Sequence, residues 1–482
     1  MLFSSIPFII LFLPVTLLLY FCCPVLKGRN LILLLASLLF YAWGEVRFVL
    51  IMIGTIAMNY CLGLLAGDEN HSPAKRKAFL AAGITLNLAV LFLFKYLGFF
   101  EQILNSLINL FHLTGSELAV HRLILPLGIS FYTFQSMSYV IDVYRNPSMV
   151  QKNILDLGLF ITFFPQLIAG PIVRYQDIAG QIKKRNHSVE KFACGIERFI
   201  TGLAKKVLLA NTLAEAVDGI LLLHWQSVPS SYLLLATVSG ILQIYYDFSG
   251  YSDMAIGLAG MFGFAIKENF NYPFVSKSLT EFWRRWHISL STWFRDYLYF
   301  PLGGNRKGIR RTVFNTLVVF TLVGLWHGAS YNFVFFGFAC GLVIIIERML
   351  KDKAKTVFGS PGKTGSVLRA CLLHLIYISL AISLFMFFRL DMKNAFSFYK
   401  SLFGNISGNI PAPVDVLFLT DRRFYIIFIF AVAFSFPWWP KLKIPANGFT
   451  VSVKYILLLA LFVLSFGTLA TDAYNPFIYF RF

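Results

Sequence analysis

The stretch FNTLVVFTLVGLWHGA, residues Phe314–Ala329, decides the class of fold. It is almost free of polar side chains, and His327 lies near its end. An ionisable group at membrane depth is costly and usually faces a cavity, a partner or a reaction. Histidine can also exchange protons near neutral pH, as few other side chains can within lipid. The stretch therefore predicts a membrane helix that carries a functional histidine.

The composition of the whole chain indicates a polytopic membrane protein. Of its 482 residues, 57% are hydrophobic, 17% aromatic and 13% charged, and the mean hydropathy is +0.70. A soluble protein carries roughly a quarter charged residues. Apolar runs near the spanning length of ~20 residues recur from end to end, so we expect about eleven transmembrane helices. The predicted fold is all-α, with re-entrant and interfacial helices, in a single membrane domain over residues 1–482.

The charged residues and cysteines exclude several other classes. The net charge is +19, but the basic residues lie in short loops between apolar runs, as the positive-inside rule predicts for cytoplasmic loops. We therefore expect membrane lipids as partners and no nucleic acid. The six cysteines form no C-x-x-C pair, so neither a metal site nor a disulfide framework is predicted. The N-terminal apolar run lacks a basic start and a cleavage site, and is typical of a retained first span.

The apolar runs set the expected order of the helices. Residues 156–176 are interrupted by prolines and a glycine, and such broken backbone is tolerated at membrane depth only where it lines a cavity or is buried in protein. Residues 312–349 are too long for one span, and we expect a turn at Gly328–Ser330. The remaining runs are two spans within 5–66, then 78–112, 122–144, 192–223, 231–265, 366–388, 423–438 and 452–470.

The segment SLTEFWRRWHISLSTWFRDYLY, Ser278–Tyr299, is the richest in side chains that could carry chemistry. Ser278 and Glu281 form an S-x-x-E capping box, which predicts a helix start. As one amphipathic helix over 276–300, the segment would place Trp283, Trp286 and later aromatic residues on one face, with His287 bordering it. An interfacial helix with an aromatic belt is one interpretation. The other is a helix that presents His287 to a cavity.

The loop PLGGNRKGIRR, Pro301–Arg311, is basic and glycine-rich. The absence of acidic residues predicts a cytoplasmic loop. Glycines beside Arg306 and Lys307 could also cradle the phosphates of a nucleotide-like donor. If the following helix begins near Arg311, His327 lies about sixteen residues along it, or roughly 24 Å from the cytoplasmic surface. A donor would then have to reach His327 through a channel.

Two polar islands interrupt other apolar runs. The island Tyr245–Asp253 places the two carboxylates Asp247 and Asp253 among aromatic residues. Buried carboxylates need partners, and structural pairing with arginines such as Arg174 or Arg284 is a better expectation than catalysis. The second island, Pro126–Gln135, contributes hydroxyls and an amide.

Taken together, these motifs resemble the membrane-bound O-acyltransferase superfamily, in its bacterial alginate O-acetylation branch. The resemblance runs over essentially the whole chain, from MLFSSIPFIILFLP through FFPQLIAGPIVRY, EFWRRWHISLSTWFRDYLYFPLGGNRKG and LVGLWHGAS to FIYFRF. It implies a multi-helix bundle around a central tunnel, with catalytic core motifs over residues 277–328. It also implies that His327 is the catalytic histidine and that His287 fills the second motif position.

The tail over residues 472–482 has a resemblance of its own. Its end, Phe477–Phe482, is similar to the C-terminal motif of the small peptide that works with the teichoic-acid D-alanylation member of the superfamily. That resemblance implies that Tyr479 carries the acyl group in transit. The alternative is an aromatic anchor at the membrane interface.

The resulting hypothesis is an acetyl relay for O-acetylation of an exported, alginate-like polysaccharide. No permanently bound cofactor is expected. Acetyl-CoA or another thioester would dock on the cytoplasmic side, with Arg306, Lys307, Trp283 and Trp286 as donor-binding candidates. His327 would act as general base, His287 would orient the thioester or stabilise oxyanion charge, and Tyr479 would accept the acetyl group.

The expected partner is an extracytoplasmic SGNH-type acetyltransferase, and the expected location is the bacterial inner membrane. Peptidoglycan O-acetylation and D-alanyl transfer to teichoic acid remain open within the superfamily. From another class, a proton-coupled transporter or flippase of a lipid-linked sugar is also compatible with buried ionisable groups.

Overall fold

The computed structural model of the chain is mainly helical in its described part. It describes residues 1–112, 118–121, 123–358, 384–405, 413–438, 445, 447–471 and 474–475, without the side chains of 351–358. No strand occurs among these residues, and the predicted all-α fold is confirmed. The backbone divides into two compact units, Met1–Ile196 with Ala255–Lys267, and Glu197–Met254 with Glu268–Phe482. The single membrane domain stays a prediction.

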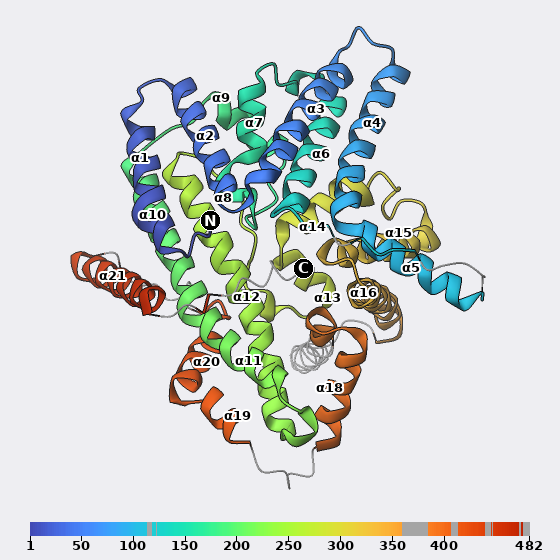
Figure 1. Cartoon of the computed structure of the whole chain (residues 1–482), viewed down its shortest axis with the longest axis vertical. Helices are drawn as coiled ribbons and strands as arrows, with labels where there is room; N and C mark the ends of the chain where they lie inside the picture. Colours follow the sequence, from blue (N-terminus) through green and yellow to red (C-terminus); the bar gives the residue numbers. More distant parts are fainter. Residues whose placement is uncertain are drawn as a thin grey trace. The chain divides into compact units, whose positions relative to one another are not determined.

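The first unit is built around three helices that pack on one another, α3 (Val49–Gly67), α4 (Pro73–Leu91) and α6 (Ile129–Arg145) (Figure 1). Asn59 and Asn87 join α3 to α4, because each side-chain amide donates to the oxygen of the other at 3.1 and 2.7 Å. Paired amides can be buried without an unsatisfied polar atom. The other elements of this unit are η1 (Phe8–Phe12), α1 (Leu13–Cys22), α2 (Leu26–Glu45), η2 (Val46–Phe48), η3 (Phe92–Tyr96), α5 (Leu97–Leu110), η4 (Pro147–Met149), α7 (Ile154–Thr162), α8 (Phe164–Leu167) and α9 (Tyr175–Lys183).

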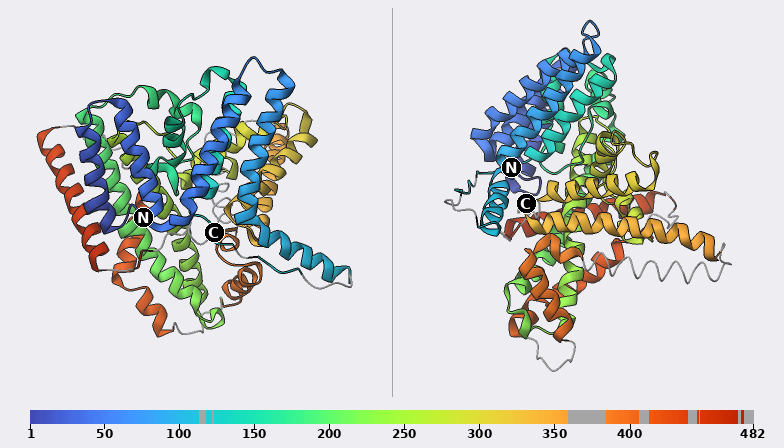
Figure 2. Two further views of the ribbon diagram at one scale, coloured as in Figure 1. Left: turned by 45° about the horizontal axis from the view of Figure 1, so that its top comes forward. Right: turned by 90° about the vertical axis from the view of Figure 1, so that its right-hand side faces the viewer.

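The second unit contains the helical hairpin of α15 (Gly308–His327) and α16 (Tyr331–Phe358), which run side by side (Figure 2). The chain turns between them at Gly328–Ser330, as the sequence predicts. Its other elements are η5 (Lys205–Ala210), α11 (Asn211–Leu222), η6 (Trp225–Ser227), η7 (Pro273–Val275), α13 (Leu279–Arg285), α14 (Ile288–Phe294), η8 (Arg295–Tyr299), α18 (Met392–Gly404), α19 (Val414–Leu419), α20 (Arg422–Phe434) and α21 (Gly448–Thr471). Helices α10 (Val189–Ala204) and α12 (Ser230–Met261) contribute residues to both units.

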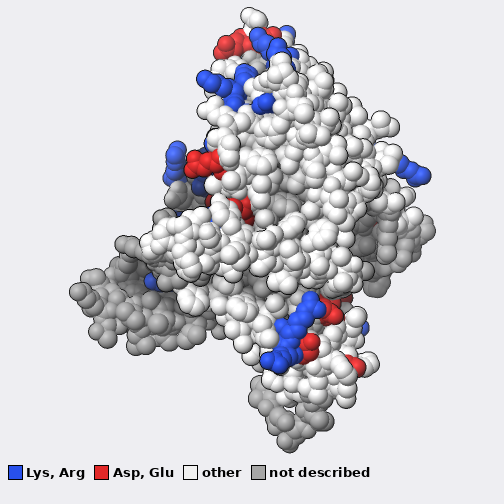
Figure 3. All heavy atoms as spheres, turned by 90° about the vertical axis from the view of Figure 1, so that its left-hand side faces the viewer, with Lys and Arg blue, Asp and Glu red and all other residues white. Residues whose placement is uncertain are grey.

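Several helical stretches of the described chain are long and apolar enough to cross a membrane. Five meet the criterion, with mean hydropathies of 1.3 to 2.2 over their best windows: Leu26–Gly67, Pro73–Leu110, Gly308–His327, Tyr331–Leu350 and Gly448–Thr471. The protein is therefore a multi-pass membrane protein, while the total of about eleven spans stays a prediction. In the view of Figure 3, much of the surface is free of Lys, Arg, Asp and Glu, whose side chains gather in a few clusters.

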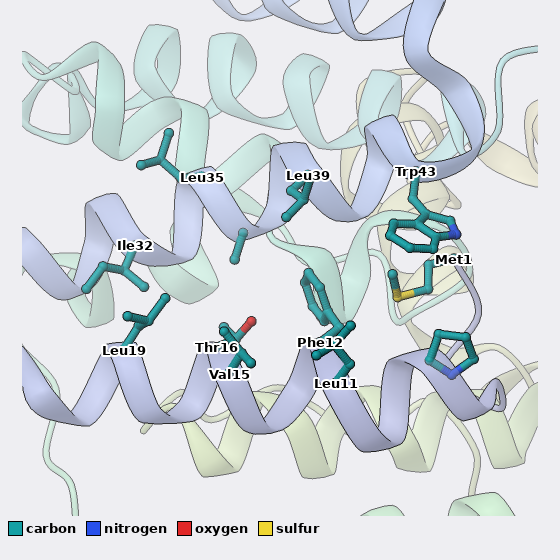
Figure 4. A pocket seen from close by; sticks show the side chains of 12 residues that line it. Met1, Leu11, Phe12, Val15, Thr16, Leu19, Ile32, Leu35, Leu39 and Trp43 are labelled. Carbon is teal, nitrogen blue, oxygen red and sulfur yellow. The ribbon is translucent and has the colours of Figure 1, made fainter.

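An apolar groove lies between the N-terminal helices of the first unit (Figure 4). Leu11, Val15 and Leu19 line it from one side, and Leu35 and Leu39 line it from α2. Its lining side chains are apolar apart from the hydroxyl of Thr16 and the indole N–H of Trp43.

The structure corrects two expectations about the helices. Residues 5–66 form three α-helices, α1, α2 and α3, because the chain breaks again near Val46 as well as near Cys23. The predicted continuous helix over 276–300 is also wrong. It consists of α13 and α14, separated at Trp286–His287, followed by a π-helical turn, η8. By contrast, the interruption predicted within 156–176 is present as a break at Phe163 between α7 and α8.

Candidate active site

His327 is placed by the close crossing of α15 and α16. It is the last residue of α15 and only 4% exposed. Gly324, one turn earlier, lies against the backbone of α16, where an added Cβ would collide with the carbonyl oxygen of Phe333 and lie 2.9 Å from the Cα of Gly337. Glycine at this position therefore allows the two backbones to approach more closely than any other residue would.

His287 lies at the break between α13 and α14, with a left-handed φ of 43°. The loop segment Asn269–Asn271 takes up backbone hydrogen bonds on both sides of this break. The backbone N–H of Ile288 donates to the carbonyl of Asn269, and that of Asn271 donates to the carbonyl of Arg285, both at 2.9 Å. A non-glycine residue in this conformation is strained and persists only where its surroundings determine it.

The start of α13 is fixed from two directions. The hydroxyl of Ser278 accepts from the backbone N–H of Glu281 at 3.0 Å, so the helix start predicted from the capping box is confirmed. In addition, the carboxylate of Glu347 on α16 accepts from the backbone N–H groups of Leu279 and Thr280 at 2.5 and 3.2 Å. A carboxylate at a helix N-terminus satisfies free N–H groups and complements the helix dipole. Helix α13, which leads into His287, is thereby attached to the hairpin that carries His327.

Asn269 determines which nitrogen of His287 carries the proton. The side-chain oxygen of Asn269 accepts from the backbone N–H of Ser289 at 3.1 Å and lies 3.2 Å from Nδ1 of His287. The amide nitrogen of Asn269 donates to Ser252 at 3.1 Å, which fixes the orientation of the amide. Nδ1 of a neutral His287 must therefore be the donor. Its Nε2 then presents a lone pair, and this buried atom has no hydrogen-bond partner within the described part of the chain.

Aromatic rings enclose the two histidines. The ring of Phe248 meets that of His287 edge-on at 4.6 Å, and Trp326 lies 5.9 Å from His287 and 5.0 Å from His327. Phe388 covers His327 at 5.1 Å. The His287 side chain is fully buried. Burial first, and then the nearby His327, lowers the pKa of His287 well below its ordinary value. The structure thus brings together two histidines that are far apart in the sequence.

The four predicted donor-binding residues differ from one another in exposure and contacts. Arg306 and Lys307 are exposed on the loop before α15, whereas Trp283 packs on Phe320 at 5.7 Å and is buried. The ring of Trp286 stacks nearly parallel on the ring of Phe282. Within the described residues, no hydrogen bond or ring contact joins the two basic residues to the two tryptophans. Their shared role in donor binding stays a prediction, and Tyr479 lies outside the described residues.

The two acids of the first polar island have partners that differ from those predicted. Asp247 pairs with Lys206 at 2.7 Å, and both side chains are at most 2% exposed. Asp253 pairs with both Arg198 and Lys205 at 2.6 Å. The expectation of structural pairing is confirmed, but the named arginines are wrong. Arg174 instead pairs with Asp177 at 2.8 Å, and Arg284 is exposed.

Asn269 is the residue of the site that sequence analysis missed. It lies in the segment ENFNYP between two helices, and nothing in its spacing distinguishes it from an ordinary loop asparagine. Its position opposite His287 depends on how the loop folds back on α13 and α14. No group of three or more His, Cys, Asp or Glu side chains in the described chain is arranged to hold a metal ion.

Comparison with known proteins assigns the chain to a family. The model of the membrane-bound O-acyltransferase family matches residues 147–390, which include both histidines. A probable alginate O-acetylase of Pseudomonas putida is 38% identical over the full length of both chains. The chain belongs to the membrane-bound O-acyltransferase family. It is therefore an O-acyltransferase of the membrane.

Two further relatives carry related names. A probable alginate O-acetylase of Pseudomonas aeruginosa is 46% identical over 73% of this chain and 66% of its own length. A peptidoglycan O-acetyltransferase of Helicobacter pylori is 33% identical over 85% of this chain and 80% of its own. The enzyme thus resembles O-acetyltransferases that act on different polymers.

The contact between Asn269 and His287 yields a prediction for this O-acyltransferase. Asn269→Leu removes the acceptor for Nδ1 while conserving the size of the side chain, and we expect acyl transfer to fall about tenfold or more. Asn269→Asp keeps an acceptor at the same place, so it should retain more activity than Asn269→Leu. Acyl transfer by the purified variants measures the difference. Equal loss in both variants would show that Asn269 does not act through this hydrogen bond.

Proposed function

We propose that the enzyme moves an acetyl group from a cytoplasmic thioester across the bacterial inner membrane for O-acetylation of an exported, alginate-like polysaccharide. The observation that carries the proposal is the burial of His287 and His327 together among aromatic rings. His287 lies between α13 and α14, and His327 ends α15. A water-poor environment strengthens electrostatic interactions and limits hydrolysis of a reactive acyl group. The acetyl group and the polymer are supported by the names of the two Pseudomonas relatives, of which one matches the whole chain and the other is 46% identical over 73% of it.

His327 is the general base of the proposed reaction. Its imidazole removes the proton from an attacking hydroxyl, whose oxygen then bonds to the thioester carbonyl carbon. The carbon–sulfur bond breaks, and the proton passes from the imidazolium to the leaving thiolate. The proposed hydroxyl belongs to Tyr479, so that the product of this step is O-acetyl-tyrosine and free thiol. A second transfer would move the acetyl group from the tyrosine to the next acceptor.

Of the two roles suggested for His287, orienting the thioester donor and stabilising oxyanion charge, the proposal keeps the first. With Nδ1 donating to Asn269, the neutral ring can only accept at Nε2. This supports a role in orienting a hydroxyl or an amide N–H of the donor. Stabilisation of an oxyanion would require the protonated ring, which burial disfavours.

The proposal includes a donor and a partner protein. Acetyl-CoA is the proposed donor, docked beside the basic loop Pro301–Arg311, where Arg306 and Lys307 are free to meet phosphates. The acetyl group would leave on the opposite face to an SGNH-type acetyltransferase that completes transfer to the polysaccharide. Peptidoglycan is the second candidate acceptor, favoured by the Helicobacter relative.

The mass of the C-terminal peptide tests the tyrosine relay directly. After incubation with acetyl-CoA, the wild-type enzyme should show a gain of one acetyl group on Tyr479, since the ester forms on its phenol oxygen. Tyr479→Phe removes that oxygen alone and should abolish both the mass shift and polymer acetylation. A Tyr479→Phe enzyme that still acetylates the polymer fully would refute the relay and leave direct transfer through His327.

A further inference from the structure

The base of the C-terminal tail is bound to the protein interior by one carboxylate. Asp218, on α11, accepts from the hydroxyl of Tyr474 through Oδ2 at 2.6 Å. Its other oxygen, Oδ1, pairs with the guanidinium of Arg389. Hydrogen bonds to charged groups are roughly twice as strong as neutral ones. One carboxylate therefore joins residues that are 256 and 171 positions away along the chain.

Arg389 connects this carboxylate to the wall of the histidine site. Its side chain is 5% exposed, and a second guanidinium nitrogen donates to the amide oxygen of Gln243 at 2.5 Å. The preceding residue is Phe388, whose ring covers His327 at 5.1 Å. The residue that covers the proposed base and the residue that binds the tail carboxylate are thus chain neighbours.

A second contact holds the next residue of the tail. The amide nitrogen of Asn211 donates to the side-chain oxygen of Asn475 at 3.1 Å and lies 3.4 Å from the carbonyl of Tyr474. Asn211 is itself held, since its side-chain oxygen accepts from the ammonium of Lys206 at 2.7 Å. The consecutive tail residues Tyr474 and Asn475 are therefore both attached to α11, the first through Asp218 and the second through Asn211.

We propose that Asp218, Arg389 and Tyr474 form a clamp that sets the reach of Tyr479 toward His327. This inference rests on the proposed tyrosine relay. Tyr479 follows Asn475 by four residues, so its Cα can lie at most about 14 Å from that of Asn475. A short tether with a fixed end converts acyl transfer to the tyrosine into an intramolecular reaction with a high effective concentration. The clamp residues are positioning residues, which contact neither donor nor acetyl group.

The test separates acetyl transfer to the tail from the chemistry of the histidine site. Full-length enzyme in detergent is given acetyl-CoA, and two rates are measured: acetylation of Tyr479 by mass spectrometry and release of free thiol. Tyr474→Phe removes only the hydroxyl that binds Asp218. We expect about a tenfold slower acetylation of Tyr479, as for a lost bond to a charged group. Hydrolysis of the thioester by water, measured as release of free thiol, should continue. The fraction of acetyl groups that reaches Tyr479 therefore falls.

The matched control is Tyr246→Phe, which removes a buried hydroxyl that donates to the carbonyl of Ala431 at 2.7 Å in the same unit. It should leave the fraction of acetyl groups reaching Tyr479 unchanged. A general loss of packing would lower both rates together in either variant. An unchanged fraction in Tyr474→Phe would overturn the clamp, provided that the wild-type enzyme carries acetyl on Tyr479. Absence of acetyl-Tyr479 from the wild-type enzyme would instead overturn the relay itself.

Discussion

Replacement of His327 by glutamine is expected to lower acetyl transfer by about 10²–10⁴-fold, the usual contribution of a positioned general base. Glutamine fills much of the space of the buried imidazole and can make hydrogen bonds, but it cannot take a proton near neutral pH. The enzyme should therefore keep its fold and its donor binding while it loses the chemical step. Transfer from acetyl-CoA to the tail, measured on purified enzyme, gives the magnitude.

The same variant separates an acyltransferase from a transporter. His224→Gln is the matched control, because His224 is exposed and belongs to the same unit. In cells, His327→Gln should yield polymer that is exported at normal levels but carries no acetyl groups, and His224→Gln should change neither. If His327→Gln lowers the amount of exported polymer while the polymer that is still exported keeps its acetyl groups, the proposed acetyl relay is wrong. A full acetyl-transfer rate in vitro would exclude His327 as the base.

Replacement of Lys206 by methionine is expected to destabilise the protein by about 3–5 kcal/mol, the cost of breaking a buried ion pair from one side. The ammonium of Lys206 contacts Asp247 and Asn211 at 2.7 Å each, and Lys206 and Asp247 are at most 2% exposed. Methionine preserves most of the chain length but leaves the carboxylate of Asp247 without its counter-charge. Thermal unfolding in detergent micelles would show a marked loss.

A double variant controls for lost packing. Lys206→Met with Asp247→Leu removes both charges, and apolar replacement of a buried pair is often neutral. We expect the double variant to recover most of the lost stability. Equal stability of the single and double variants would contradict the prediction, because it would show that loss of the Lys206 charge beside Asp247 costs nothing. With Asp247→Leu alone as the fourth protein, the measurements form a double-mutant cycle, whose coupling energy isolates the pair itself.

Local sequence patterns predicted much of the framework. The turn at Gly328–Ser330 and the helix start at Ser278 are present in the structure. Both depend on short-range physics: glycine and polar residues end an apolar run, and a serine hydroxyl satisfies an N–H three residues later. His327 could be selected for the same reason, since an ionisable group in an apolar run stands out without any knowledge of its neighbours.

The continuous helix over 276–300 could not be corrected from the sequence. The aromatic spacing of this segment fits one helical face, and no proline or glycine interrupts it. The break at His287 exists because the backbone around Asn269 takes the hydrogen bonds that a continuous helix would have used internally. Such competition comes from a segment that periodicity does not register.

Hydropathy and motif order in the sequence alone determined that the chain is a helical membrane protein, because lipid selects for long apolar helices. They also selected the histidine of W-H-G as a candidate site residue, because lipid disfavours isolated ionisable groups. Only the tertiary structure decided which polar groups meet. Asn269 on His287, Lys206 on Asp247 and Tyr474 on Asp218 are pairs set by how helices and loops pack together. A buried charge takes whichever partner the packing brings within reach, and that partner can be hundreds of residues away.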